Sequence, residues 1–224
     1  MIKISKRLLN ISQLVSGDII ADVGCDHGKL SEYLLKNKIC QKAIVSDISK
    51  SSLQKAIDLM NRESLNFESI HCNGLLGYSD KIIDECIISG MGGDEIIKII
   101  SSSPIDIKSY ILSPQHNIID VKKFMLNSGF VITYDKIIKD KNKFYTIIKC
   151  EKDIDFKHKQ ITTFDLYFGK DNFNAISDDF REYLDFEFNK NTSLMNKVDD
   201  NKKSEILEYI KLIEIARKRL VKYE

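Results

Sequence analysis

Two glycine-rich turns carry the residue types in this sequence that could bind and act on a ligand. The first, Asp22–Gly28 (DVGCDHG), follows the apolar run Ile19–Ala21, and the second, Gly90–Gly93 (GMGG), follows the stretch Glu85–Ser89 (ECIIS). Glycine lets a backbone turn sharply and approach a ligand where a Cβ would collide with it. A buried strand that ends in such a turn and enters a helix is how doubly wound α/β folds open a nucleotide site. The first turn departs from the dinucleotide fingerprint, because Asp26, followed by a histidine, stands where a middle glycine is usual.

Polar residues at two further predicted strand ends fit the same site. Asp47 lies nineteen residues after Gly28, where a carboxylate can accept hydrogen bonds from both hydroxyls of a ribose. Asn73, just before Gly74, has an amide that suits an adenine edge. Each also has a purely structural explanation, since Asp47 fits a helix N-cap or a turn and Asn73 fits a turn. Three glycines within residues 90–93 cost conformational entropy on folding. This cost makes close approach of a ligand a better explanation for them than a purely structural role.

The elements that must position these residues follow from the hydrophobic pattern. Strands are predicted at residues 19–23, 42–47, 68–72, 85–89 and 109–112, with helices between them. Strands and helices that alternate at this spacing imply parallel βαβ units, with helices on both faces of one sheet. Two β-rich runs, 130–138 and 143–150, then form a hairpin. A mostly parallel sheet closed by an antiparallel hairpin is typical of Rossmann-like class I methyltransferases and argues against a dehydrogenase half.

The pattern changes after Cys150. A charged connector over 151–159 leads to two helical segments, 177–198 and 202–223, and the second has apolar residues at heptad-like spacing. We expect an antiparallel helical hairpin whose apolar faces meet each other, with an intermolecular coiled coil as the alternative. The sequence therefore predicts two domains, an α/β domain over 1–152 and a helical domain over 153–224.

Composition limits the class of protein. The chain has 224 residues, 43% hydrophobic and 30% charged, with a net charge of +1, so no bulk field draws it to nucleic acid or membrane. Its five cysteines are scattered and form no CxxC pair, which indicates reduced thiols and neither a zinc site nor a disulfide framework. No apolar run approaches a membrane span, and the N-terminus lacks the features of a signal peptide. We expect a cytoplasmic protein without a metal or a membrane partner.

Five motifs, in this order, resemble the bacterial TrmK family. They are Ala21–Gly28 (ADVGCDHG), Asn73–Leu75 (NGL), Gly90–Gly93 (GMGG), Pro114–Asn117 (PQHN) and Lys143–Tyr145 (KFY). The resemblance is close over about residues 1–150, and the helical hairpin beyond looks like the family's C-terminal coiled-coil domain. The family's members are S-adenosylmethionine-dependent tRNA (adenine(22)-N1)-methyltransferases, so the resemblance implies this activity, this cofactor and a tRNA substrate.

The resemblance also implies roles for individual residues. The expected cofactor-binding residues are Asp22, Gly24, Asp26, His27, Gly28, Asp47, Asn73, Gly74, Gly90 and Met91, with Ile48 and Gly92 beside them. The candidate catalytic residues follow from the chemistry of the acceptor and are Asp26, His27, Gln115 and Asn117. Three positions depart from the family pattern. Asn73 stands where aspartate is usual, Ser89 stands where alanine is usual, and His116 looks inserted in the loop after the fifth strand.

Methylation of adenine N1 does not require the protein to remove a proton from the base. N1 is unprotonated at neutral pH and the product is cationic, so positioning and nearby oxygen atoms should supply the catalysis. Asp26 is the candidate for that electrostatic role. His27 either orients the cofactor or the base or is a hydrogen-bonded structural residue. The adenine must turn outward, and Met91, Gln115, His116, Asn117 and Tyr145 are the candidate groups to read it.

Local basic residues offer contacts for a tRNA backbone. They are Lys3, Lys6, Arg7, Lys136, Lys139, Lys141, Lys143, Lys157, Lys159, Arg217, Lys218, Arg219 and Lys222. Each group alone could simply be a solvated face, and together they would make a footprint for folded RNA. We expect a monomer. The alternatives are an RNA-binding adaptor that keeps the fold without reacting, and an NAD-dependent oxidoreductase.

Overall fold

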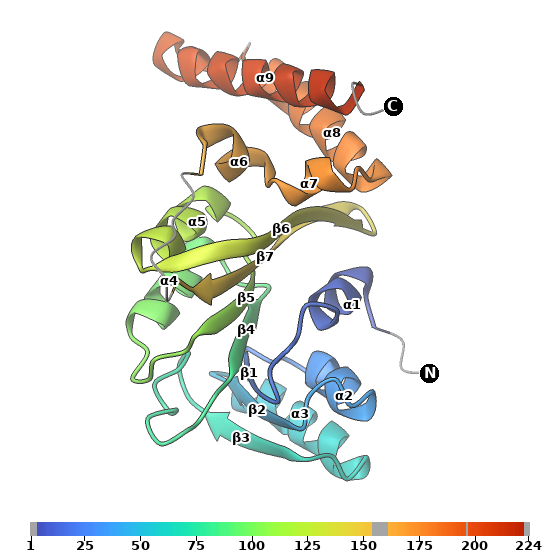
Figure 1. The fold of residues 1–224 in the computed structure, drawn as a ribbon, viewed down its shortest axis with the longest axis vertical. Coiled ribbons are helices and arrows are strands. Elements are labelled where there is room, and N and C mark those ends of the chain that lie inside the picture. Colours follow the sequence, from blue (N-terminus) through green and yellow to red (C-terminus); the bar gives the residue numbers. More distant parts are fainter. Residues whose placement is uncertain (1–3, 154–160, 196, 222–224) are drawn as a thin grey trace. The chain divides into compact units, whose positions relative to one another are not determined.

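A seven-stranded sheet organises the first part of the chain (Figure 1). The structure is a computed structural model that describes residues 4–153, 161–195 and 197–221. The strand order across the sheet is β3-β2-β1-β4-β5-β7-β6. The strands are β1 (Ile19–Val23), β2 (Lys42–Asp47), β3 (Phe67–His71), β4 (Glu85–Ser89), β5 (Ser109–Ser113), β6 (Phe130–Asp140) and β7 (Lys143–Lys152).

Helices cover both faces of this sheet. In Figure 1, α4 and α5 lie on one face, and α1, α2 and α3 lie on the other. Each has an apolar stripe that packs inward, as Ile96 and Ile99 of α4 do, both nearly without solvent exposure. The helices are α1 (Lys6–Ser12), α2 (Lys29–Lys36), α3 (Lys50–Arg62), α4 (Gly93–Ser101) and α5 (Ile118–Asn127).

The strand order changes direction at β1. This strand pairs in parallel with β2 on one side and with β4 on the other. The chain therefore leaves β1 toward one edge of the sheet and returns at β4 on its other side. Such a switch point opens a crevice at the carboxyl ends of the strands, where open α/β sheets bind ligands. The two glycine-rich turns follow β1 and β4, so both lie at this point.

The structure confirms the predicted mostly parallel sheet with a closing antiparallel hairpin. Strands β1, β2 and β4 have the predicted bounds, because a central parallel strand is apolar along its length. The hairpin strands are longer than predicted. They leave a turn of two residues, 141–142, in which Lys141 has a φ of 56°, in place of the predicted connector over 139–142. β5 pairs antiparallel with β7.

Contact density divides the chain into two compact units. The first comprises Met1–Tyr134 and Tyr145–Lys159, and the second comprises Asp135–Phe144 and Gln160–Glu224. The far end of the β6–β7 hairpin thus groups with the C-terminal helices. The division into domains at residue 152 stays a prediction, and most of the predicted connector, residues 154–159, lies outside the described residues.

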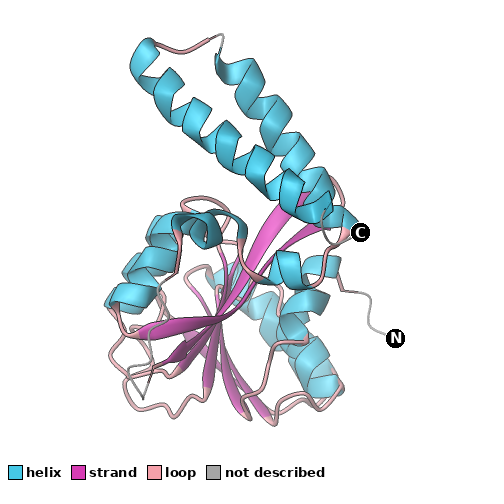
Figure 2. Cartoon of the chain, turned by 45° about the horizontal axis from the view of Figure 1, so that its top comes forward, coloured by secondary structure: helices cyan, strands magenta, loops and turns pink. Residues whose placement is uncertain are grey.

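The second unit has its own apolar core. Its helices are α6 (Thr163–Phe168), α7 (Asp171–Asn174), α8 (Asp178–Met195) and α9 (Asp200–Val221). Figure 2 shows α8 and α9 side by side as the predicted helical hairpin. Their apolar faces meet in a cluster with α6 and the hairpin, composed of Ile137, Phe164, Phe168, Phe180, Leu184, Ile213, Ala216 and Leu220.

Side chains of this unit accept hydrogen bonds from backbone N–H groups on the outer edge of β6. The backbone N–H groups of Asp135 and Ile137 donate to the side-chain oxygens of Asp171 (2.8 Å) and Asn172 (3.0 Å). The next N–H on that edge, of Lys139, donates to Asp179 (2.8 Å). An edge strand otherwise presents a row of unpaired donors, so α7 and the start of α8 cover it. Neither α6 nor α7 is among the elements predicted from the sequence.

Two kinds of feature are missing from the part of the chain that the structure describes. No helix there is both long enough and apolar enough to cross a lipid bilayer. No group of three or more His, Cys, Asp or Glu side chains is placed there to hold a metal ion.

Candidate functional site

A cavity of about 500 Å³ lies at the switch point, where the loops after β1, β2 and β4 meet. Its volume is in the range of small-molecule sites. Nine of the predicted site residues line it: Gly24, Asp26, Asp47, Ile48, Asn73, Gly74, Gly90, Met91 and Gln115.

The Asp47 carboxylate ties two of these loops together. Its Oδ2 accepts a hydrogen bond from the backbone N–H of Asp26 (3.1 Å), and its Oδ1 accepts one from the backbone N–H of Ser49 (2.8 Å). Ser49, and not Asp47, is the N-cap of α3. Each carboxylate oxygen has a second lone pair. Asp47 is therefore fixed in place while it keeps acceptor capacity toward the cavity.

A smaller cavity of about 120 Å³ adjoins the first, and Gly24 and Asp26 line both. Asp22 borders it from the end of β1, 5% exposed, with its Oδ2 accepting a hydrogen bond from the Ser31 hydroxyl (2.7 Å). Burial raises the pKa of Asp22 to about 6, the Ser31 hydrogen bond opposes that rise, and the charge of Asp47 adds to it. A cation in this cavity would favour the ionised carboxylate.

Asp26 and His27 occupy the turn between these elements. Asp26 has a φ of 49°, in the left-handed region, and 73% of its side chain is exposed. The His27 ring borders the smaller cavity, with Nε2 3.2 Å from Lys55 Nζ and 3.6 Å from Asp26 Oδ1. His27 thus has protein partners that fit a structural role and also faces a cavity.

The glycines divide into two groups. Gly24 and Gly90 border the larger cavity with φ values of 72° and 87°, so their backbone needs glycine there. Gly28 also has a positive φ, but a Cβ on it would lie 2.8 Å from the Ala56 Cβ, so it serves the packing of α3. A Cβ on Gly92 would lie 2.5 Å from the His116 ring. Gly28 and Gly92 line neither cavity, and for both the close approach is to the protein itself.

The loop after β5 separates the two residues predicted there as catalytic. Gln115 lines the larger cavity and donates from Nε2 to the Gly90 carbonyl (2.5 Å). Asn117 lines neither cavity, adopts a φ of 54° as the N-cap of α5, and donates from Nδ2 to Asp94 Oδ2 (2.8 Å). This geometry indicates that Asn117 stabilises the loop between β5 and α5.

Four polar residues in the larger cavity were not predicted as site residues: Arg7, Ser46, Ser89 and Glu95. From the sequence, Arg7 is predicted only as a basic contact for tRNA, since nothing local shows that α1 reaches this cavity. Asp26, Asp47 and Glu95 against one guanidinium leave the lining with an excess of carboxylates. Such a lining suits a cationic ligand centre.

Several predicted tRNA-contacting residues already have partners within their own unit. Lys139 pairs with Glu182, Arg217 with Asp185, and Arg219 stacks on Phe164. Tyr145, a candidate base-reading residue, lies under the Arg7 guanidinium. The Arg7 Cζ atom is 5.1 Å from the centroid of the Tyr145 ring. Four of the predicted basic residues, Lys3, Lys157, Lys159 and Lys222, lie outside the described residues.

Comparison with known proteins identifies the family to which the chain belongs. Residues 4–148 match the family model described as a methyltransferase domain. A candidate tRNA methyltransferase of Mycoplasma genitalium is 32% identical over 154 residues, 66% of this chain and 69% of that protein. The tRNA (adenine(22)-N(1))-methyltransferase of Bacillus subtilis is 24% identical over 159 residues, 67% of this chain and 66% of that protein. The solved structure of M. capricolum TrmK with S-adenosyl-homocysteine has a TM-score of 0.86 and 24% identity, covering 97% of this chain and 99% of that one.

Proposed function

This chain belongs to the methyltransferase-domain family, and on that premise we propose that it methylates N1 of adenine 22 in tRNA. The methyl donor is S-adenosyl-L-methionine. The relatives support this assignment: one is named for this reaction, and the solved TrmK structure holds the demethylated cofactor. One observation in the chain itself carries it, the cavity where Asp47, Asn73 and the two glycine-rich turns converge.

The residues around the cavity fit the parts of this cofactor. Asp47 has acceptor capacity for the ribose hydroxyls, and Asn73 offers an amide to the adenine edge. Ile48 is 67% exposed beside Asp47 and gives an apolar face on which a base can lie. The excess of carboxylates offsets the positive charge of a sulfonium. Gly28, Gly92 and Asp22 support this lining from behind or from the smaller cavity.

The chain's part in the reaction is positioning and electrostatics. S-adenosylmethionine supplies a methyl group on a sulfonium sulfur, which the lone pair of adenine N1 attacks in line. Because N1 carries no proton at neutral pH, no side chain has to act as a base before the attack. Positive charge then develops on the methylated base, and oxygen atoms fixed nearby lower the energy of that state. Asp26 takes this role, while Met91 and Gln115 border the path of the base.

Methyl transfer to an unmodified tRNA transcript tests the proposal. The purified chain should incorporate labelled methyl from S-adenosylmethionine, and digestion should yield 1-methyladenosine. Binding of S-adenosylhomocysteine without transfer to any tRNA would favour the non-reacting adaptor. Preference for NAD over S-adenosylhomocysteine would favour the oxidoreductase.

We also propose that the enzyme acts as a monomer in the cytoplasm. Its RNA substrate is made there, and all five cysteines are free, as reducing conditions require. Light scattering of the purified chain should give the mass of one chain, and a dimer mass at low concentration would contradict this.

A further inference from the structure

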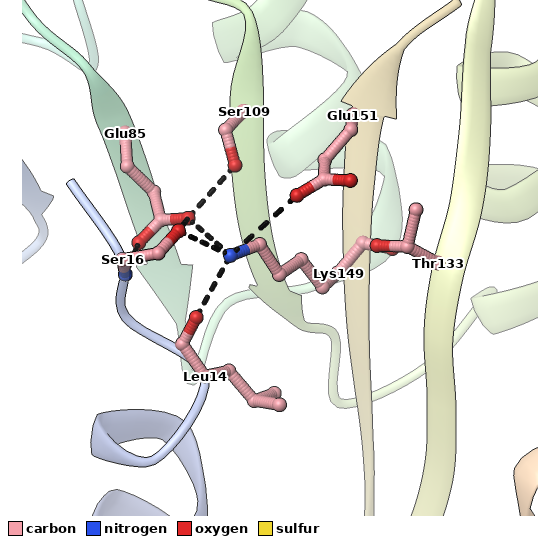
Figure 3. Close-up of polar contacts among 7 residues, drawn as sticks. All are labelled: Leu14, Ser16, Glu85, Ser109, Thr133, Lys149 and Glu151. Carbon is pink, nitrogen blue, oxygen red and sulfur yellow. Dashed lines mark hydrogen bonds and ion pairs between the residues drawn. The ribbon is translucent and has the colours of Figure 1, made fainter.

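A buried ion pair between β4 and β7 lies beside Leu14 and Ser16 of the N-terminal segment (Figure 3). Lys149 of β7 and Glu85 of β4 are 8% and 1% exposed, with Lys149 Nζ 2.8 Å from Glu85 Oε1. Taking two charges out of water is costly unless further hydrogen bonds satisfy them. The groups that form hydrogen bonds with Lys149 and Glu85 therefore identify the segment that this ion pair anchors.

Most of its partners lie in the connector between α1 and β1. Lys149 Nζ donates to the Leu14 carbonyl (2.8 Å) and to Ser16 Oγ (2.7 Å), so its three donors are used. Glu85 Oε2 accepts the backbone N–H of Ser16 (3.1 Å), and Glu85 Oε1 accepts the Ser109 hydroxyl (2.8 Å). One ion pair thus anchors residues 14–16 to three strands of the sheet.

The same strand holds the other end of the N-terminal segment. Tyr145 and Lys149 are four residues apart on β7, so their side chains leave the same face. Tyr145 lies under the Arg7 guanidinium at the start of α1, and Lys149 binds the connector after α1. A helix of seven residues is not stable alone, so tertiary contacts must hold α1 in place. These two contacts act together with the packing of α1 against α2 and the burial of Ile11.

Arg7 is the residue that α1 brings to the site. It lines both cavities, and its Nη1 would lie 3.1 Å from a Cβ on Gly90. A guanidinium does not stabilise a sulfonium or a methylated base, because all three are cationic. The ligand groups that suit a guanidinium are oxyanions. The cofactor's carboxylate and an RNA phosphate both have this chemistry.

We propose that the Lys149–Glu85 pair is a positioning element of the active site, which anchors the α1–β1 connector so that Arg7 binds an oxyanion of the cofactor or of the tRNA. The proposal rests on the methyltransferase function proposed above. Lys149 acts through Arg7 and touches neither substrate.

A double-mutant cycle tests this coupling. The wild type, Lys149→Met, Arg7→Ala and the double variant are compared by calorimetry with S-adenosylhomocysteine and by steady-state methylation of tRNA. Lys149→Met and Arg7→Ala should weaken the same step by about tenfold. Cofactor affinity falls if the oxyanion is the carboxylate, and the KM for tRNA rises if it is a phosphate. The double variant should be no worse than Arg7→Ala.

Two further variants keep the test decisive. Lys152→Met removes an exposed lysine of the same strand, paired with Asp106, and should change neither quantity. If Lys149→Met does not fold, Ser16→Ala enters the same cycle, since it removes one partner of Lys149 and leaves the ion pair intact. In the absence of ligand, the rate of amide hydrogen exchange over residues 8–16 should also rise in Lys149→Met and Ser16→Ala.

Losses that multiply in the double variant would overturn the inference, as would a Lys149 variant with unchanged affinity and KM. A wild type that neither binds S-adenosylhomocysteine nor methylates tRNA would instead refute the proposed function.

Discussion

The backbone N–H of Asp26 donates a hydrogen bond of 3.1 Å to the Asp47 carboxylate, and this contact joins the loops that follow β1 and β2. Asp26 is held at a positive φ there, so its side chain projects from a fixed backbone into the larger cavity. The residue assigned to the cofactor ribose therefore also orients the residue assigned to the reacting base.

Replacing Asp47 by Asn should weaken cofactor binding. An amide cannot accept both backbone N–H groups that the carboxylate accepts, and it loses the charge that strengthens those bonds. We expect the dissociation constant of S-adenosylhomocysteine, measured by calorimetry, to rise by at least about tenfold. Asp58→Asn, on the exposed side of α3, is the matched control. Equal affinities of the two variants would remove Asp47 from the site.

Asp26→Asn separates electrostatic catalysis from cofactor binding. Asparagine tolerates the left-handed backbone of Asp26, so the turn should stay intact. We expect kcat for tRNA methylation to fall by about tenfold or more, with cofactor affinity within about twofold of the wild type. A loss of affinity as large as the loss of kcat would assign Asp26 to the cofactor. No change in either would make it scaffold.

Asp22 should make the stability of the ligand-free chain depend on pH. Its pKa is raised from 3.8 to about 6, chiefly by burial, so the folded chain binds this proton more tightly than the unfolded one. The stabilisation is complete below pH 3.8 and is lost as the pH rises to about 6. Asp22→Asn keeps an acceptor for Ser31 without the titration. Between about pH 4.5 and 7, the free energy of unfolding of the wild type in urea should fall by about 2 kcal/mol relative to this variant. A constant difference would contradict the raised pKa.

Gln115 and Asn117 should respond differently to truncation. Asn117→Gly keeps the positive φ and removes the hydrogen bond to Asp94, so it should lower stability by about 1 kcal/mol and leave cofactor affinity unchanged. Gln115→Ala removes a side chain that borders the cavity and should mainly lower kcat. Thermal unfolding and steady-state kinetics of the two variants measure this. A lower cofactor affinity for Asn117→Gly would return Asn117 to the site.

Features encoded by local pattern were predictable from the sequence. The buried strands β1, β2 and β4 are largely apolar runs, and Gly24 and Gly90 mark turns that local backbone geometry requires. The start of helix α6 is also encoded locally, by the capping box between Thr162 and Asp165.

Features set by contacts between distant segments were not predictable. Arg7 lines the cavity from α1 and lies over the Tyr145 ring of β7, and no local pattern in the sequence shows this. The partner of Lys149 is 64 residues away in sequence, at Glu85. Gly92 looks like a ligand-approach glycine until the structure brings the His116 ring against it.

Methylation of two tRNA transcripts that differ at one base tests the central claim most directly. One transcript carries adenine at position 22 and the other carries guanine there, and both are incubated with the chain and labelled S-adenosylmethionine. We predict stoichiometric incorporation into the first, recovered as 1-methyladenosine at position 22, and none into the second. Equal incorporation into both transcripts would contradict the assignment of the methylated base.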